Sequence, residues 1–161
     1  MARFLRIIRQ ARWFAYPDIP WLAPGELQAD ALSDLRTEGN SLSVWLVGSD
    51  PDERRIVVAL AANRERLDVF DYVVFEDTRL VGLGVHIAPV DADTPDAAVN
   101  QFHRELRNLT VRQLAELAVV VSVGRRQRTL PKSVKSRLIE ALQAGTLNRG
   151  KLNPKLLAEL E

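Results

Sequence analysis

The spacing of apolar residues changes partway along the chain, and this change limits the fold more than any other feature of the sequence. In residues 41–47 the side chains alternate as they do in a strand, and residues 71–76 and 80–87 predict a β-hairpin. From Pro95 onward, apolar residues recur every three or four positions, which is typical of helices. The first such stripe consists of Val99, Phe102, Leu106 and Leu109. The sequence therefore predicts an α+β fold: a small, mostly antiparallel sheet of about three strands with packed helices, followed by an all-helical C-terminal part.

The clearest helix start lies in the middle of the first half. Asp50 is a residue type that caps helices, Pro51 suits the first helical position, and Glu53 stands three residues after the cap. We therefore expect a helix over residues 51–66 with Asp50 as its N-cap.

Similar start signals occur in the second half. Thr110 and Gln113 have the spacing of a capping box for a helix that ends at Gly124. This helix is apolar almost all round, so we expect it to be central. Pro131 and Pro154 mark the starts of two further helices.

The first 17 residues of the chain leave two interpretations open. On a helix, one stripe would hold the apolar residues Phe4, Ile7, Ile8, Ala11 and Phe14. On a strand, the four arginines of this segment would alternate between both faces. A helix is favoured, with a strand as the alternative.

We expect one domain over residues 1–161, with a mixed strand-and-helix part at 1–94 and a helical part at 95–161. A chain of this length buries enough apolar surface to fold without crosslinks. The expected core consists of Leu42, Val44, Leu46, Leu60, Val73, Phe75, Leu83, Val85, Phe102, Leu114 and Leu117.

The absence of cysteine removes several classes of chemistry. Disulfides, thiol nucleophiles, zinc ribbons and iron–sulfur clusters all need cysteine, and the chain has none. No apolar run approaches the ~20 residues of a membrane span, and arginines interrupt the first residues where a secretory signal would need an apolar stretch. We therefore expect a soluble cytoplasmic protein with no cofactor.

The net charge of +1 hides an uneven distribution. Residues 26–100 hold six basic and fifteen acidic side chains, whereas residues 125–161 hold nine basic and three acidic ones. The functional interpretation of the basic segment 125–137 is a polyanion site, which would bind nucleic acid. The structural interpretation is that it docks against the acidic middle of the same chain. The candidate polyanion-binding residues are Arg125, Arg126, Arg128, Lys132 and Lys135.

Two further sites are candidates. In the predicted strand 80–87, Gly82, Gly84 and His86 share a face, which leaves a gap that a partner, a ligand or an internal helix would fill. His86 and His103 are the two histidines, and a metal site would combine them with nearby aspartates. Those aspartates are Asp91, Asp93 and Asp96.

No standard catalytic constellation is complete in this sequence. The Gly82-Leu83-Gly84 run lies inside a predicted strand, not between a strand and a helix, so it does not predict a dinucleotide site. The predicted function is a non-catalytic domain that binds another macromolecule, namely a protein. The alternatives are nucleic-acid binding through residues 125–137 and a metal-dependent enzyme built on the two histidines. The partner and the oligomeric state stay open.

Overall fold

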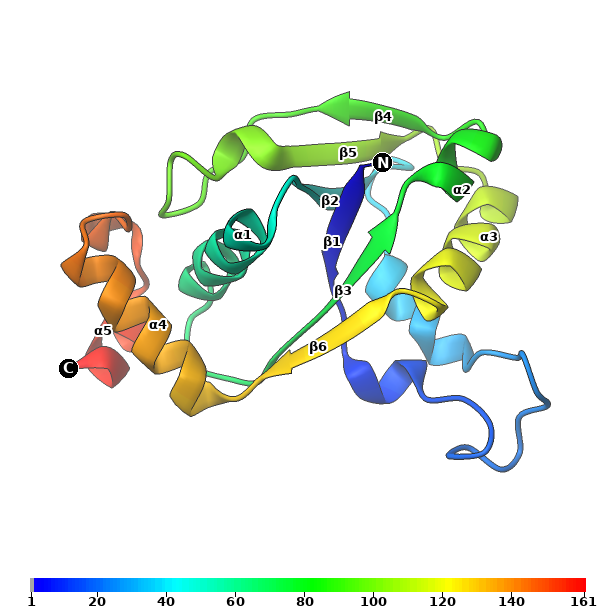
Figure 1. The fold of residues 1–161 in the computed structure, drawn as a ribbon, viewed down its shortest axis with the longest axis horizontal. Helices are drawn as coiled ribbons and strands as arrows, with labels where there is room; N and C mark the ends of the chain where they lie inside the picture. Colours follow the sequence, from blue (N-terminus) through cyan, green and yellow to red (C-terminus); the bar gives the residue numbers. More distant parts are fainter. Residues whose placement is uncertain (1) are drawn as a thin grey trace.

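An antiparallel six-stranded sheet forms the centre of the molecule (Figure 1). The computed structural model describes residues 2–161, apart from the side chain of Arg79. The strand order is β4-β5-β2-β1-β3-β6. The strands are β1 (Arg3–Ile7), β2 (Leu42–Val47), β3 (Phe70–Glu76), β4 (His86–Pro89), β5 (His103–Arg107) and β6 (Arg125–Thr129).

Helices cover both faces of this sheet (Figure 1). Successive strand residues point to opposite faces, so Tyr72 and Val74 of β3 join one core while Val73 and Phe75 join the other. We call the helices over the first face the α1 layer: α1 (Asp50–Ala62), α4 (Pro131–Gln143) and α5 (Pro154–Leu160). The helices over the second face, with their connecting loops, form the α3 layer: α2 (Thr78–Gly82), α3 (Val111–Ser122) and the 3-10 helices η1 (Gln10–Trp13) and η2 (Ala29–Leu35). Two short 3-10 turns, η3 (Asn100–Phe102) and η4 (Arg149–Lys151), complete the structure.

The prediction of about three strands followed by an all-helical part is wrong. Both β5 and β6 lie beyond residue 95, and strands and helices are interleaved along the whole chain. Leu106 fitted a helical stripe, but in the structure it pairs with Leu42 of β2 and with Ile87 of β4. A short apolar pattern fits a helix and a strand almost equally well. Pairing with β2 and β4 is what makes residues 103–107 a strand.

Two further strands, β1 and β6, were not predicted, and their positions in the sheet explain why. β1 lies between β2 and β3, and the helix layers cover both faces of the sheet there, so the adjacent residues Phe4 and Leu5 are buried on opposite sides. Strands buried on both faces do not alternate in hydropathy, so the apolar pattern of this segment favoured a helix over a strand. β6 has the sequence Arg-Arg-Gln-Arg-Thr, which carries no apolar pattern because charged side chains are favoured on an edge strand.

The predicted strand at residues 80–87 is the end of a helix, a turn and the start of a strand. Residues 78–82 form α2, and β4 begins at His86. Gly84 has a φ of +67°, a conformation that suits glycine and interrupts a strand. The predicted alternation therefore does not place Gly82, Gly84 and His86 on one face of a strand.

Several local predictions are confirmed, with one shift of a cap. The capping box of Thr110 and Gln113 is present, and helices begin at Pro131 and Pro154. At α1 the N-cap is Ser49, not Asp50: its side-chain oxygen accepts a hydrogen bond from the backbone N–H of Asp52 at 3.3 Å. Ser49 has the extended backbone that a cap needs, while Asp50 is already in the helix.

About half of the expected core is buried as predicted. The buried members are Leu42, Val44, Leu60, Val73, Phe75 and Leu117, and the half-buried members are Leu46, Leu83, Val85, Phe102 and Leu114. Within residues 2–161, the helices are all too short or too polar to cross a membrane.

Candidate protein-interaction surface

The two histidines lie on neighbouring strands but do not converge. His86 is exposed on β4 opposite Arg107, four residues along β5 from His103. The His103 ring packs against Trp45, with ring centroids 5.0 Å apart, and its Nδ1 donates to the carbonyl oxygen of Val90 at 3.2 Å. Burial lowers the pKa of His103. Among the described residues, no three Asp, Glu or His side chains are arranged to hold a metal ion.

The glycines predicted to line a groove are open to solvent. A Cβ added at Gly82 or at Gly84 would meet no atom within 4 Å, so no helix packs on them. Gly82 ends α2, and Gly84 lies in the turn that leads to β4. Their role in binding stays a prediction.

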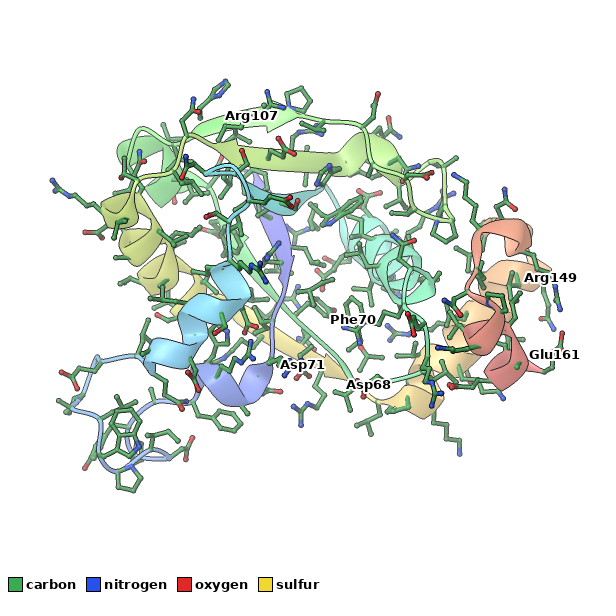
Figure 2. All side chains as sticks on the ribbon, turned by 180° about the vertical axis from the view of Figure 1, so that it is seen from behind. Asp68, Phe70, Asp71, Arg107, Arg149 and Glu161 are labelled. Atoms are coloured by element: carbon green, nitrogen blue, oxygen red, sulfur yellow. The ribbon has the colours of Figure 1, made fainter. Side chains whose placement is uncertain are left out.

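The basic segment is divided between the two faces of the sheet. Arg125 faces the α1 layer and forms an ion pair with Glu53, whereas Arg126 and Arg128 face the α3 layer. Arg128 donates two hydrogen bonds to the Asp71 carboxylate, at 2.8 and 2.9 Å. This ion pair lowers the pKa of Asp71. Figure 2 shows Asp71 beside η1, whose residue Gln10 also donates to it.

The remaining basic residues also bind groups of the same chain or stand apart. Arg126 donates to the carbonyl oxygen of Trp13, and Lys135 to that of Glu159. Lys132 is exposed at the start of α4. A phosphate would therefore compete with internal partners at four of the five predicted positions.

Exposed apolar side chains gather instead on the α3 layer. In the described part of the chain, all the large exposed apolar side chains except Leu130 belong to this layer. They are Phe14, Tyr16, Trp21, Leu32, Val81, Val111, Val119 and Val123. Figure 1 shows η2, α2, α3 and the loop after η1 together at one end of the molecule, with α4 and α5 at the other.

The outer face of α3 contributes a continuous apolar stripe. Val111, Ala115, Val119 and Val123 are spaced by four residues, so they lie on one side of the helix, and all four are exposed. Val111 is 87% exposed. The opposite side of the helix packs on the sheet through Leu117 and neighbouring residues. Contrary to expectation, this apolar helix is not central, and one apolar face has no cover among the described residues.

The second part of the surface is the loop between η1 and η2, which we call the aromatic loop (residues 14–28). Its two ends are held together, because the Gln28 side-chain amide donates to the carbonyl oxygens of Ala11 and Phe14 at 3.0 and 2.9 Å. Within the loop Leu22 is buried, whereas Trp21 is 73% and Tyr16 54% exposed. Compact loops with joined ends are frequently functional.

A buried carboxylate anchors the base of this loop. Asp34 of η2 accepts hydrogen bonds from the Trp13 indole and the backbone N–H of Arg9, both at 2.8 Å, and pairs with Arg12. Arg6 of β1 donates two hydrogen bonds to the Asp34 carbonyl oxygen, and burial lowers the pKa of Arg6. Both flanking helices are thereby fixed to the sheet.

A hollow of about 260 Å³ lies where α3 meets β6. Val120, Val123 and Gly124 line it together with the end of β3. Gly124 permits the close approach, since a Cβ there would lie 2.6 Å from Cγ2 of Val73. The exposed Val123 thus connects the apolar stripe to a shallow depression.

Sequence reasoning missed this surface, although one signal was present. A helix that is apolar on every side and lies at the surface must leave an apolar face uncovered.

Comparison of the chain with protein-family models, curated proteins and solved structures gave no match.

Proposed function

We propose that the protein is a non-catalytic protein-binding domain whose contact surface is the α3 layer. The observation that carries this proposal is the concentration of exposed apolar side chains on one layer. Single exposed apolar residues are common on protein surfaces, but a gathered set on neighbouring elements marks an interaction site. Aromatic residues supply large contact areas in such interfaces.

The buried polar groups support a binding role rather than a catalytic one. Glu53 accepts hydrogen bonds from Tyr72 and Arg125, and Asp34 accepts from Trp13, Arg9 and Arg12. In the described residues, every buried side-chain nitrogen or oxygen has a partner. These carboxylates hold elements together, as expected of groups with a structural role.

Site-specific photocrosslinking in cells tests the proposal. A photoreactive residue placed at Val119 should crosslink to a discrete protein, because this position lies within the apolar stripe of α3. The same residue at Leu130 is the matched control, since Leu130 is the exposed apolar side chain outside the α3 layer. Val111→Ser with Val123→Ser should abolish the crosslink from position 119.

Stability measurements separate loss of binding from loss of folding. Exposed side chains contribute little to the folded state, so the double serine variant should unfold within about 0.5 kcal/mol of the parent. Equal crosslinking from positions 119 and 130, or crosslinks that persist in the double variant, would contradict the proposal.

A further inference from the structure

The charge of the aromatic loop indicates what kind of surface it fits. Between Arg12 and Arg36 the chain has no lysine or arginine and four acidic residues. One of these, Asp34, is buried, and Glu26 accepts a hydrogen bond from the backbone N–H of Ala23. The other two, Asp18 and Asp30, are exposed and have no hydrogen-bond or ion-pair partner among the described residues.

The exposed aromatic rings of the loop have a matching preference. Trp21 and Tyr16 flank Asp18 in the sequence, and both rings are mostly exposed. The faces of Trp and Tyr rings attract cations, and arginine guanidinium groups stack on them. The exposed aromatic faces, with Asp18 between them in the sequence and Asp30 at the start of η2, are complementary to basic side chains.

The loop is also organised before any partner binds. Turn hydrogen bonds link Ile19 to Ala15, Leu22 to Ile19 and Glu26 to Ala23 within the loop. Its prolines at 17, 20 and 24 restrict the backbone further. Binding therefore costs less conformational entropy than it would for an unstructured segment.

We infer that the aromatic loop, through its Asp18 and the adjacent Asp30 of η2, binds an arginine- or lysine-rich segment of a partner protein. This inference rests on the proposed function and adds the chemical class of the partner. The charged side chains of residues 14–28 are all acidic, which favours a basic partner over nucleic acids or an anionic membrane. Basic side chains of the partner lie over the rings of Tyr16 and Trp21 and pair with the two carboxylates.

A dye-labelled nona-arginine peptide is the probe for this inference. We expect it to bind the full chain, with an affinity that falls as the salt concentration rises from about 50 to 300 mM. Trp13 and Trp45 are buried, so Trp21 is the tryptophan that a soluble quencher reaches. Bound peptide should therefore protect the protein fluorescence from acrylamide.

Charge variants decide whether the loop is responsible. Asp18→Asn with Asp30→Asn should weaken peptide binding about fivefold, because two exposed charge pairs are lost. Asp91→Asn with Glu140→Gln removes two exposed charges elsewhere in the chain and should leave the affinity unchanged. Trp21→Ala should weaken binding to a similar extent through loss of the ring.

The inference is overturned if the two double variants weaken peptide binding equally. It is also overturned if nona-glutamate binds as tightly as nona-arginine, or if acrylamide still quenches Trp21 when the peptide is bound. Crosslinking from Val119 then shows whether the proposed function stands without it. A discrete crosslink that the asparagine variant retains at full strength would keep the α3 layer as an interface and exclude the basic partner segment.

Discussion

A trio of polar side chains, of which Glu53 and Tyr72 are buried, joins three distant parts of the chain. Tyr72 of β3 donates to one carboxylate oxygen of Glu53 at 2.9 Å, and Arg125 of β6 binds the other. Glu53 belongs to α1, so the trio links two strands to the helix that covers them. Burial, together with the hydrogen bond to the Glu53 carboxylate, raises the pKa of Tyr72 to about 12.

This raised pKa predicts how stability depends on pH at the basic end. In the unfolded chain the pKa of Tyr72 would be about 10, so its contribution to stability is fully present below that pH and is lost as the pH rises through about 12. Tyrosinate absorbance of the folded protein should show a step near pH 12 that Tyr72→Phe removes. If the step that the variant loses were instead centred at about pH 10, Tyr72 would not be held by Glu53.

At the scale of elements, α1 depends on its cap. The side chain of Ser49 accepts from the N–H of Asp52, and its hydroxyl donates to the Asp52 carboxylate at 2.6 Å. Pro51 occupies the first turn, where its missing N–H does no harm. The helix buries Ile56, Val57 and Leu60 against the sheet, so the cap supports a large share of the α1 layer.

We expect Ser49→Ala to lower the free energy of unfolding by ~1 kcal/mol, since an N-terminal N–H loses its acceptor. Asp50→Ala is the control, because Asp50 makes a single exposed contact with Arg3 at 3.5 Å. Urea denaturation followed by circular dichroism measures both variants. The assignment of the cap would fail if the two variants changed stability equally.

At the scale of the whole molecule, one sheet combines both halves of the chain. β5 lies between β2 and β4, and β6 pairs with β3 along the opposite edge. The core of the α1 layer likewise mixes Ile56 and Phe70 with Leu138 and Leu156 of the last helices. Neither half contains a complete core of its own.

A fragment of residues 1–94 should therefore show no cooperative thermal transition, because it lacks two strands and most of the helical cover. Insertion of four glycine and serine residues after Asp18 is the control. That position is exposed in the aromatic loop, so the full chain should keep its cooperative transition. A cooperative transition in the fragment would indicate that the first part folds alone.

Helices and strands that are selected by interactions between residues close in sequence could be predicted from the sequence. The capping box of Thr110 and Gln113 and the proline at position 131 define helix starts through neighbouring residues. The strand at 42–47 has its own alternation and the one at 70–76 its own apolar run. In each case the interactions that select the structure lie within a few residues of one another, so the sequence pattern contains them.

The three missed strands and the candidate site depend on contacts between distant segments. β1, β5 and β6 form because they pair with the edges of β2 and β3. A pattern within five residues contains no information about such a distant partner. Val119 and Val121 have the same side chain on the same helix, yet one is exposed and the other buried. What separates them is the side of α3 that meets the sheet. The sequence by itself determined, to within one residue, where four of the five described α-helices begin and that α3 is apolar almost all round. Tertiary packing decided which apolar face remained open, because a helix can bury only the side that another element covers.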